Sequence, residues 1–191
     1  MNDDFNTIKN ILLKLRNQYA AGCDNDICYK KLPITERDIV SDIRQSLLEF
    51  CNINGYDAHC EIRPAPNEEI EPEDMKRLPR IDVVILRDRN NKSWLEAAKK
   101  LQGKYKKGHI EARFSSIPLA FFHTAIEVKI QSKFSDAKDD IVMLSNITDK
   151  NPSCNCFFVL LNARGQVRDH QKIITFAKEK QVEIIEHTAR I

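Results

Sequence analysis

The sequence predicts an α/β fold in which helices flank a central β-sheet, and three observations carry this prediction. Two short segments, 81–86 and 156–161, are almost continuously apolar, as is typical of strands buried on both faces of a sheet. Longer segments place apolar residues at the spacing of one helix face. Helical and strand patterns also alternate between residues 35 and 162. We therefore expect one α/β domain over residues 1–191.

The composition supports a single globular domain. The chain has 191 residues, of which 42% are hydrophobic and 30% charged, so it can bury a core of normal size and is too apolar for a disordered chain. The net charge of +2 does not by itself indicate a nucleic-acid partner. No apolar run approaches the ~20 residues that cross a bilayer, and the acidic N-terminus does not resemble a signal peptide. We expect a cytoplasmic protein without a membrane partner.

Two amphipathic helices are predicted before the first strand. Residues 4–20 carry one apolar stripe, formed by Phe5, Ile8, Ile11, Leu12, Leu15 and Tyr19. Thr35 is a suitable N-cap for the second helix, Asp38 is its capping-box partner, and Gly55 ends the helix. The stripe of this helix includes Val40, and Glu36 falls on the same stripe one turn earlier. The Glu36 carboxylate is therefore expected to face inward.

The remaining elements follow in alternation. A strand is predicted over 56–63, ended by Pro64 and Pro66, and an acidic loop over 68–74. A second strand at 81–86 is followed by a turn at 88–91. The later segments are predicted as helices over 92–107, 136–146 and 167–180 and as strands over 121–130, 156–161 and 182–185.

Charged residues inside the apolar strands are the most informative feature of the chain. Asp82 lies between Ile81 and Val83. Glu127 and Lys129 lie in the segment 121–130, and because side chains alternate along a strand, both project from one face. Burying such groups costs free energy unless they pair with each other or hold a metal ion. We therefore interpret these positions as functional.

The element order helix, strand, strand, strand, helix, strand, with Asp82 in the second strand and Glu127-Val128-Lys129 in the third, resembles the core of the PD-(D/E)XK nuclease superfamily. The resemblance covers about residues 35–162. It implies a restriction-endonuclease-like fold with a central mixed sheet flanked by helices. It also implies a metal-dependent nuclease acting on phosphodiester bonds, most simply a DNA endonuclease of restriction, defence or repair type.

The same resemblance assigns roles to individual residues. Asp82 and Glu127, with Glu36 from the preceding helix, are expected to bind Mg²⁺ or Mn²⁺. Lys129 is expected to contact the attacking water or the scissile phosphate, which makes the catalytic set Glu36, Asp82, Glu127 and Lys129. By strand alternation, and not from the resemblance, Gln131 shares the face of Glu127 and Lys129 and could orient the water, with a plain polar strand end as the alternative.

The chemistry is consistent with these residue types. Mg²⁺ prefers hard oxygen ligands and keeps several waters, so two or three carboxylates suffice to bind it. A bound metal lowers the pKa of a coordinated water and screens charge on the phosphate. Lys129 could act as a cation that stabilises the transition state or, if desolvated without its proton, as a base. The sequence leaves these two roles open.

Two departures from the family pattern matter. The residue before Asp82 is Ile81 where proline is frequent, and the interval between Asp82 and Glu127 is lengthened by an insertion at about 88–118. Glu111 is therefore a competing partner for Asp82, although no lysine lies two residues after it. The non-functional alternative is a set of buried ion pairs, for example Glu127 with Arg80.

The insertion is the most basic part of the chain. Its cations and aromatic residues include Lys92, Trp94, Lys99, Lys100, Lys104, Tyr105, Lys106, Lys107, His109 and Arg113. Positive charge near a phosphodiester site favours nucleic acid, because neutralising phosphates releases counterions. We therefore expect nucleic acid, and DNA in particular, to contact Lys99, Lys100, Lys104, Lys106, Lys107 and Arg113. A solvated helix face is the alternative.

Other interpretations stay open at this point. The chain could be a non-catalytic relative that binds nucleic acid or a partner protein, or a nuclease subunit whose specificity lies on a separate chain. The first helix could mediate a homodimer. Without an export signal, disulfides are not expected. A thiolate zinc site could use Cys23, Cys28, Cys154 and Cys156, although the spacing is unusual, and the alternative is that Cys51, Cys60 and Cys156 are core residues.

Overall fold

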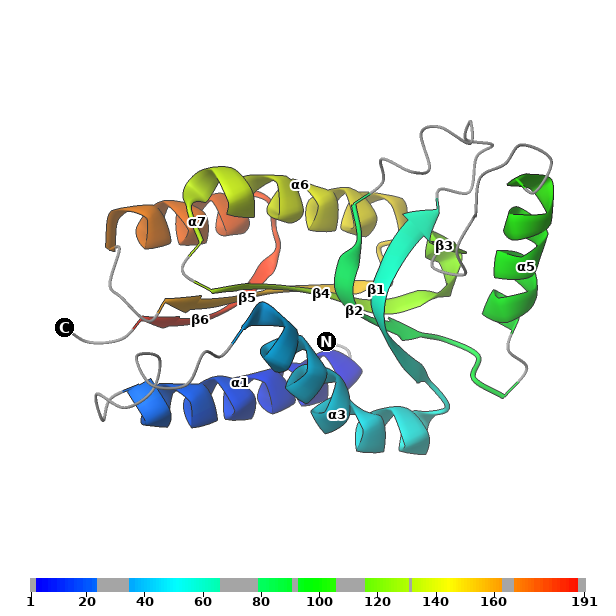
Figure 1. Cartoon of the computed structure of the whole chain (residues 1–191), viewed down its shortest axis with the longest axis horizontal. Coiled ribbons are helices and arrows are strands. Elements are labelled where there is room, and N and C mark those ends of the chain that lie inside the picture. The colour runs from blue at the N-terminus through cyan, green and yellow to red at the C-terminus, as the bar shows by residue number, and fades with distance from the viewer. Residues whose placement is uncertain are drawn as a thin grey trace.

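A six-stranded sheet between two layers of helices forms the described part of the chain (Figure 1). The computed structural model describes residues 3–23, 35–65, 79–90, 93–105, 116–130, 132–162 and 167–188. The strands are β1 (Asp57–Ala65), β2 (Ile81–Leu86), β3 (Ser116–Pro118), β4 (Phe122–Ile130), β5 (Asn155–Asn162) and β6 (Glu183–Thr188). The helices are α1 (Asp3–Cys23), α3 (Glu36–Asn54), α5 (Ser93–Tyr105), α6 (Phe134–Lys150), α7 (Val167–Glu179) and the short 3-10 helix η1 (Leu119–Phe121).

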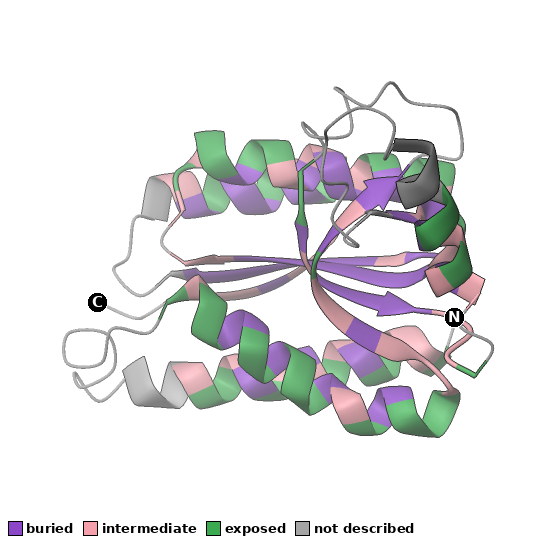
Figure 2. Cartoon of the chain, turned by 45° about the vertical axis from the view of Figure 1, so that its right-hand side comes forward, coloured by how far each residue is buried: buried purple, intermediate pink, exposed green. Residues whose placement is uncertain are grey.

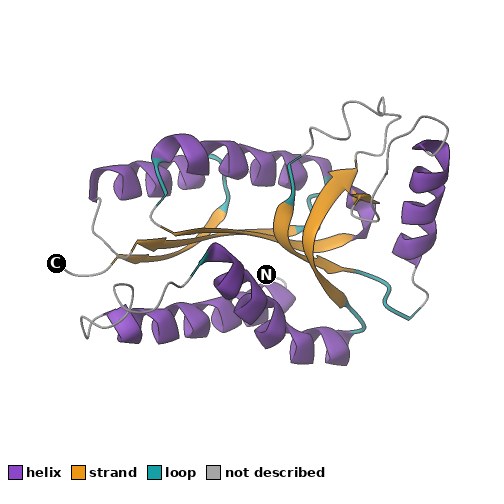
Figure 3. Cartoon of the chain, in the orientation of Figure 1, coloured by secondary structure: helices purple, strands orange, loops and turns teal. Residues whose placement is uncertain are grey.

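The sheet is mixed, in the order β3-β1-β2-β4-β5-β6. β2 pairs antiparallel with both β1 and β4, whereas β4, β5 and β6 run parallel to one another. The parallel strands are joined through α6 and α7, because a parallel connection needs a long crossover (Figure 3). This confirms the predicted fold class, a central mixed sheet flanked by helices.

Helices cover both faces of the sheet (Figure 1). α1 and α3 pack on one face, against Val83, Ile126 and Val128, and α6 and α7 pack on the other, against Val84 and Ala125. The central strands are buried on both sides, as the nearly continuous apolar runs predict (Figure 2). Among the described residues, no helix combines the length and the apolar character that a membrane span requires.

The structure differs from the sequence prediction at the edge of the sheet. β1 continues through Pro64 to Ala65, because its last residues pair with β3, a three-residue strand that the sequence did not indicate. Pairing of β1 with β2 ends at Ile62, so the missing N–H of Pro64 breaks no bond on that side. α6 extends from Phe134 to Lys150, beyond the predicted helix. The acidic segment 68–74 lies outside the described residues.

The predicted capping box at the start of α3 is confirmed. The Thr35 hydroxyl accepts a hydrogen bond from the Asp38 N–H at 3.3 Å, and the Asp38 carboxylate accepts one from the Thr35 N–H at 2.8 Å. Gly55 ends the helix with φ +70°, a left-handed conformation that favours glycine. The capping box fixes the first turn of α3 and therefore the backbone that carries Glu36.

Replacement of Thr35 by alanine is expected to lower the free energy of unfolding by about 1 kcal/mol, because the Asp38 N–H loses the hydroxyl that accepts its hydrogen bond. Urea unfolding of the two proteins measures this difference. Ser46→Ala, at an exposed position in the middle of α3, is the matched control and should change stability little. Equal losses in both variants would show that the cap contributes nothing.

Candidate active site

Asp82 and Glu127 lie opposite each other on neighbouring strands. β2 and β4 pair in the register Val83↔Ile126 and Val84↔Ala125, and continuing it by one residue places Asp82 across from Glu127. Cross-strand neighbours share a face of the sheet, here the face that α6 covers. Asp82 Oδ2 also accepts the N–H of Val128 at 2.8 Å, which orients the aspartate toward β4.

The two carboxyl groups are electrostatically coupled. The Glu127 side chain is 2% exposed, and this burial, with Asp82 and Asp140 nearby, raises the pKa of Glu127 well above its ordinary value. Burial also raises the pKa of Asp82, although the Val128 N–H, Lys129 and a hydrogen bond with Glu127 oppose the effect. Of the two carboxyl groups, Glu127 is therefore the one that burial and its acidic neighbours favour most strongly in the protonated form.

One carboxylate oxygen of the Asp82–Glu127 pair has no hydrogen-bond partner among the described residues. This atom is Glu127 Oε1, which is buried. A buried polar atom of this kind costs free energy in the folded protein and calls for an explanation. Two adjacent carboxylates with a free oxygen form a donor set that suits a hard divalent cation.

Lys129 lies two residues beyond Glu127 and contacts carboxylates from two helices. Its Nζ is 3.1 Å from Asp140 Oδ2 on α6 and 4.0 Å from Glu36 Oε2 on α3. Burial lowers the pKa of Lys129, but the carboxylates of Asp140 and Glu36 outweigh it, so the pKa lies above its ordinary value. The ammonium group is therefore cationic in this structure.

Asp140 is a site residue that sequence reasoning missed. It lies on the buried stripe of α6 together with Ala137, Ile141 and Leu144. A carboxylate on an apolar helix stripe is the same signal that selected Glu36 on α3. Applied to 134–150, that signal would have found Asp140.

Glu36 reaches the site from the opposite face of the sheet. It is the first residue of α3, and its Oε1 accepts the N–H of Ile130 at 3.3 Å. Near the end of β4, the structure therefore places Asp82 beside Glu127 and Glu36 beside Lys129. Across the described ranges, no three His, Cys, Asp or Glu side chains are grouped closely enough to hold a metal ion by themselves.

The predicted basic surface is described only in part. Lys99 and Lys100 are exposed on α5. Trp94, interpreted above as an aromatic residue among these cations, is instead buried, with its ring edge-on to His59 at 4.9 Å between centroids. The side chain of Lys104 and the residues Lys106, Lys107, Glu111, Arg113 and Gln131 lie outside the described part.

The suggested ion pair of Arg80 with Glu127 does not form. Arg80 contacts Glu61 on β1 at 2.5 Å instead, at the exposed edge of the sheet.

The prediction that Cys51, Cys60 and Cys156 are core residues is confirmed. Cys51 and Cys156 are buried, and Cys60 is half-buried. Cys154 is also buried, and its thiol donates to the carbonyl of Asn155 at 3.9 Å.

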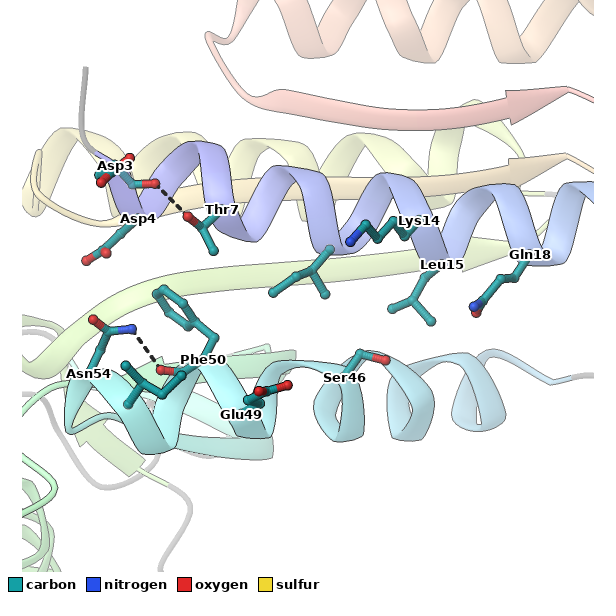
Figure 4. A pocket seen from close by; sticks show the side chains of 12 residues that line it. Asp3, Asp4, Thr7, Lys14, Leu15, Gln18, Ser46, Glu49, Phe50 and Asn54 are labelled. Carbon is teal, nitrogen blue, oxygen red and sulfur yellow. Dashed lines mark hydrogen bonds between the residues drawn. The ribbon is translucent and has the colours of Figure 1, made fainter.

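A separate hollow of about 610 Å³ lies between α1 and α3 (Figure 4). Asp3, Asp4 and Phe50 line one end, and Lys14 and Gln18 line the other. None of the four residues Glu36, Asp82, Glu127 or Lys129 contributes to its lining. The carboxylate pair of the candidate active site is therefore distinct from this hollow.

Comparisons with known proteins bear on the fold. No protein-family model and no curated protein gives a significant match to this sequence. Among solved structures, NucC from P. aeruginosa ATCC27853 in its cAAA-bound form is similar, with a TM-score of 0.52 and 10% sequence identity, covering 94% of this chain and 75% of that chain. At this identity the likeness concerns the architecture, which is restriction-endonuclease-like.

Proposed function

We propose that this chain is a metal-dependent nuclease that hydrolyses phosphodiester bonds, acting as an endonuclease on DNA in restriction, defence or repair. One observation carries the proposal. Asp82 and Glu127 lie side by side on the two central strands of the sheet, and a cationic lysine follows Glu127 on the same strand. The likeness of the fold to NucC supports the broad class of nuclease.

Asp82 and Glu127 are the proposed direct ligands of Mg²⁺ or Mn²⁺. Both offer hard oxygen donors, and Glu127 Oε1 is free to accept a metal bond. Because Mg²⁺ keeps several of its waters, two protein carboxylates are enough, and Glu36 would complete the coordination through water. When bound, the cation would polarise the phosphate and lower the pKa of a bound water.

Lys129 is the proposed electrostatic stabiliser. Its raised pKa favours the ammonium form, so it acts as a fixed positive charge toward the phosphate and not as a base. A neutral lysine would have required burial without carboxylate neighbours, whereas Asp140 and Glu36 both lie within 4.0 Å of Nζ. Of the two roles considered for Lys129, a base or a cation that stabilises the transition state, we propose the second.

Lys99 and Lys100 belong to the proposed DNA-binding surface and are the two of its residues whose side chains the structure describes. Charge reversal of both residues to glutamate is expected to weaken DNA binding and to reduce the slope of log K against log[salt] by roughly 2, since each phosphate contact contributes about 0.9. Fluorescence anisotropy over a salt series measures the slope. The double variant Lys172→Glu/Lys178→Glu, at exposed positions of α7, carries the same charge change and should bind DNA like the wild type. Equal weakening of DNA binding in both double variants would show that only the net charge matters and would contradict a specific role for Lys99 and Lys100.

A plasmid assay tests the proposed function. Supercoiled DNA is incubated with the full chain and Mg²⁺ or Mn²⁺, with and without EDTA. Nicking that requires the metal supports the proposal. Binding without cutting favours a non-catalytic relative, and inactivity until a second chain is added favours a nuclease subunit. The homodimer stays a prediction, which sedimentation of the same sample tests.

A further inference from the structure

Two carboxylates approach the Lys129 ammonium, but at different distances. Asp140 Oδ2 lies 3.1 Å from Nζ, within the range of a charge-assisted hydrogen bond. Glu36 Oε2 lies at 4.0 Å, where only longer-range attraction remains. Glu36 is in addition engaged by the Ile130 N–H through its other oxygen. Asp140 is therefore the group that holds the ammonium in place.

Asp140 is also the better anchored of the two partners. Its neighbours on the same stripe of α6, Ala137, Ile141 and Leu144, are fully buried against the sheet. The Asp140 side chain is 19% exposed, whereas that of Glu36 is 45% exposed. A short side chain on a packed helix can fix the end of a long one, and lysine has a flexible four-carbon stem that needs such a partner.

We propose that Asp140 is a positioning residue that orients the Lys129 ammonium beside Glu127. Asp140 touches neither the metal ion nor the substrate in this proposal and acts only through Lys129. The catalytic consequence rests on the proposed function, in which the oriented ammonium faces the phosphate. The orientation itself does not depend on catalysis and can be measured separately.

The first experiment observes the lysine ammonium groups of the full chain by ¹H–¹⁵N NMR. Ordered, hydrogen-bonded ammonium groups give correlations that freely rotating ones lose to exchange, and Lys129→Met identifies the relevant signal. We expect the Lys129 correlation in the wild type, its loss in Asp140→Asn, and its retention in Glu36→Gln. Retention in Asp140→Asn, or loss in Glu36→Gln, overturns the proposal.

Asp139→Asn is the matched control for these measurements. Asp139 precedes Asp140 on α6 and is exposed, so the substitution removes the same charge without a contact to Lys129. The Lys129 correlation should persist in this variant. If it disappears as in Asp140→Asn, the effect belongs to the charge of the helix as a whole, and the proposal fails.

The second experiment measures cleavage. Asp140→Asn should lower kcat by about 100-fold, because a misplacement of about 1 Å costs a factor of this size. The KM for DNA and the Mg²⁺ affinity should stay close to wild type, and Asp140→Glu should recover part of kcat. An unchanged kcat, or a parallel loss of Mg²⁺ affinity that makes Asp140 a ligand, contradicts the assignment. Absence of cleavage by the wild type contradicts the proposed function alone, since the NMR result still decides the orientation.

Discussion

Alanine at Glu127 or at Lys129 is expected to abolish metal-dependent cleavage, with losses of at least about 10²–10³-fold. The two variants should fail for different reasons. Glu127 is one of two proposed ligands and carries the free oxygen, so Glu127→Ala should also lose Mg²⁺ binding. Lys129 contributes positive charge and not a metal bond, so Lys129→Ala should bind Mg²⁺ normally and lose only the chemical step.

Calorimetric titration with Mg²⁺ and single-turnover cleavage of plasmid DNA separate these two effects. Circular dichroism shows whether each variant stays folded, which we expect because neither side chain belongs to an apolar cluster. Glu96→Ala and Lys133→Ala, both at exposed positions, are the matched controls and should cleave like the wild type. Full activity in Glu127→Ala or Lys129→Ala would end the nuclease proposal.

Glu127→Gln is expected to stabilise the metal-free protein at neutral pH. At neutral pH the folded wild type must either keep a proton on Glu127 that the unfolded chain releases or bury its charge, and both cost free energy that a glutamine of similar shape does not. The glutamine also retains a hydrogen-bond donor for Asp82, which the wild type supplies only while Glu127 is protonated. The Glu127 carboxylate, which the proposed function needs, is therefore expected to lower the stability of the metal-free fold.

The pH dependence of this effect follows from the raised pKa of Glu127. The folded protein keeps a proton that the unfolded chain loses above its ordinary pKa of 4.5, so the free energy of unfolding falls as pH rises through and above that value. Glu127→Gln lacks this titration. Its stability advantage should be absent below that pKa and grow toward neutral pH.

Urea unfolding from pH 4 to pH 8 in EDTA measures the difference between the two proteins. Adding Mg²⁺ should then stabilise the wild type, because the ion binds only the folded state, and leave Glu127→Gln unchanged. Glu96→Gln is the control, since an exposed glutamate should show neither effect. A Glu127→Gln protein less stable than the wild type at neutral pH in EDTA would show that the carboxylate is structurally satisfied and has no need of a cation.

Local pattern was sufficient for most of the secondary structure and for the centre of the site. Strand alternation placed Glu127 and Lys129 on one face, and the structure has Lys129 and Asp140 in contact on that face. The capping box of Thr35 and Asp38 and the bounds of β2 were likewise predicted, because a helix cap and a short apolar strand depend on neighbours in sequence.

Other features depend on segments that are distant in sequence. The N–H of Ile130 meets Glu36 across a separation of 94 residues, and no local pattern records that contact. β3 is only three residues long and exists because β1 offers it a partner, which is also why β1 passes through Pro64. Trp94 was assigned to a basic surface by its neighbours in sequence, but its ring packs against His59 on β1.

Most helices and strands, and their order along the chain, could be read from the sequence, because periodicity and capping act over a few residues. The mixed sheet and the partnership of Asp82 with Glu127 followed only from the family resemblance, which left Glu111 as a competitor. The 3.1 Å contact of Lys129 with Asp140 and the 4.0 Å separation of Lys129 from Glu36 became evident only with the three-dimensional fold. Those distances arise from the packing of α3 and α6 on opposite faces of one sheet, and packing between layers is a property of the whole chain.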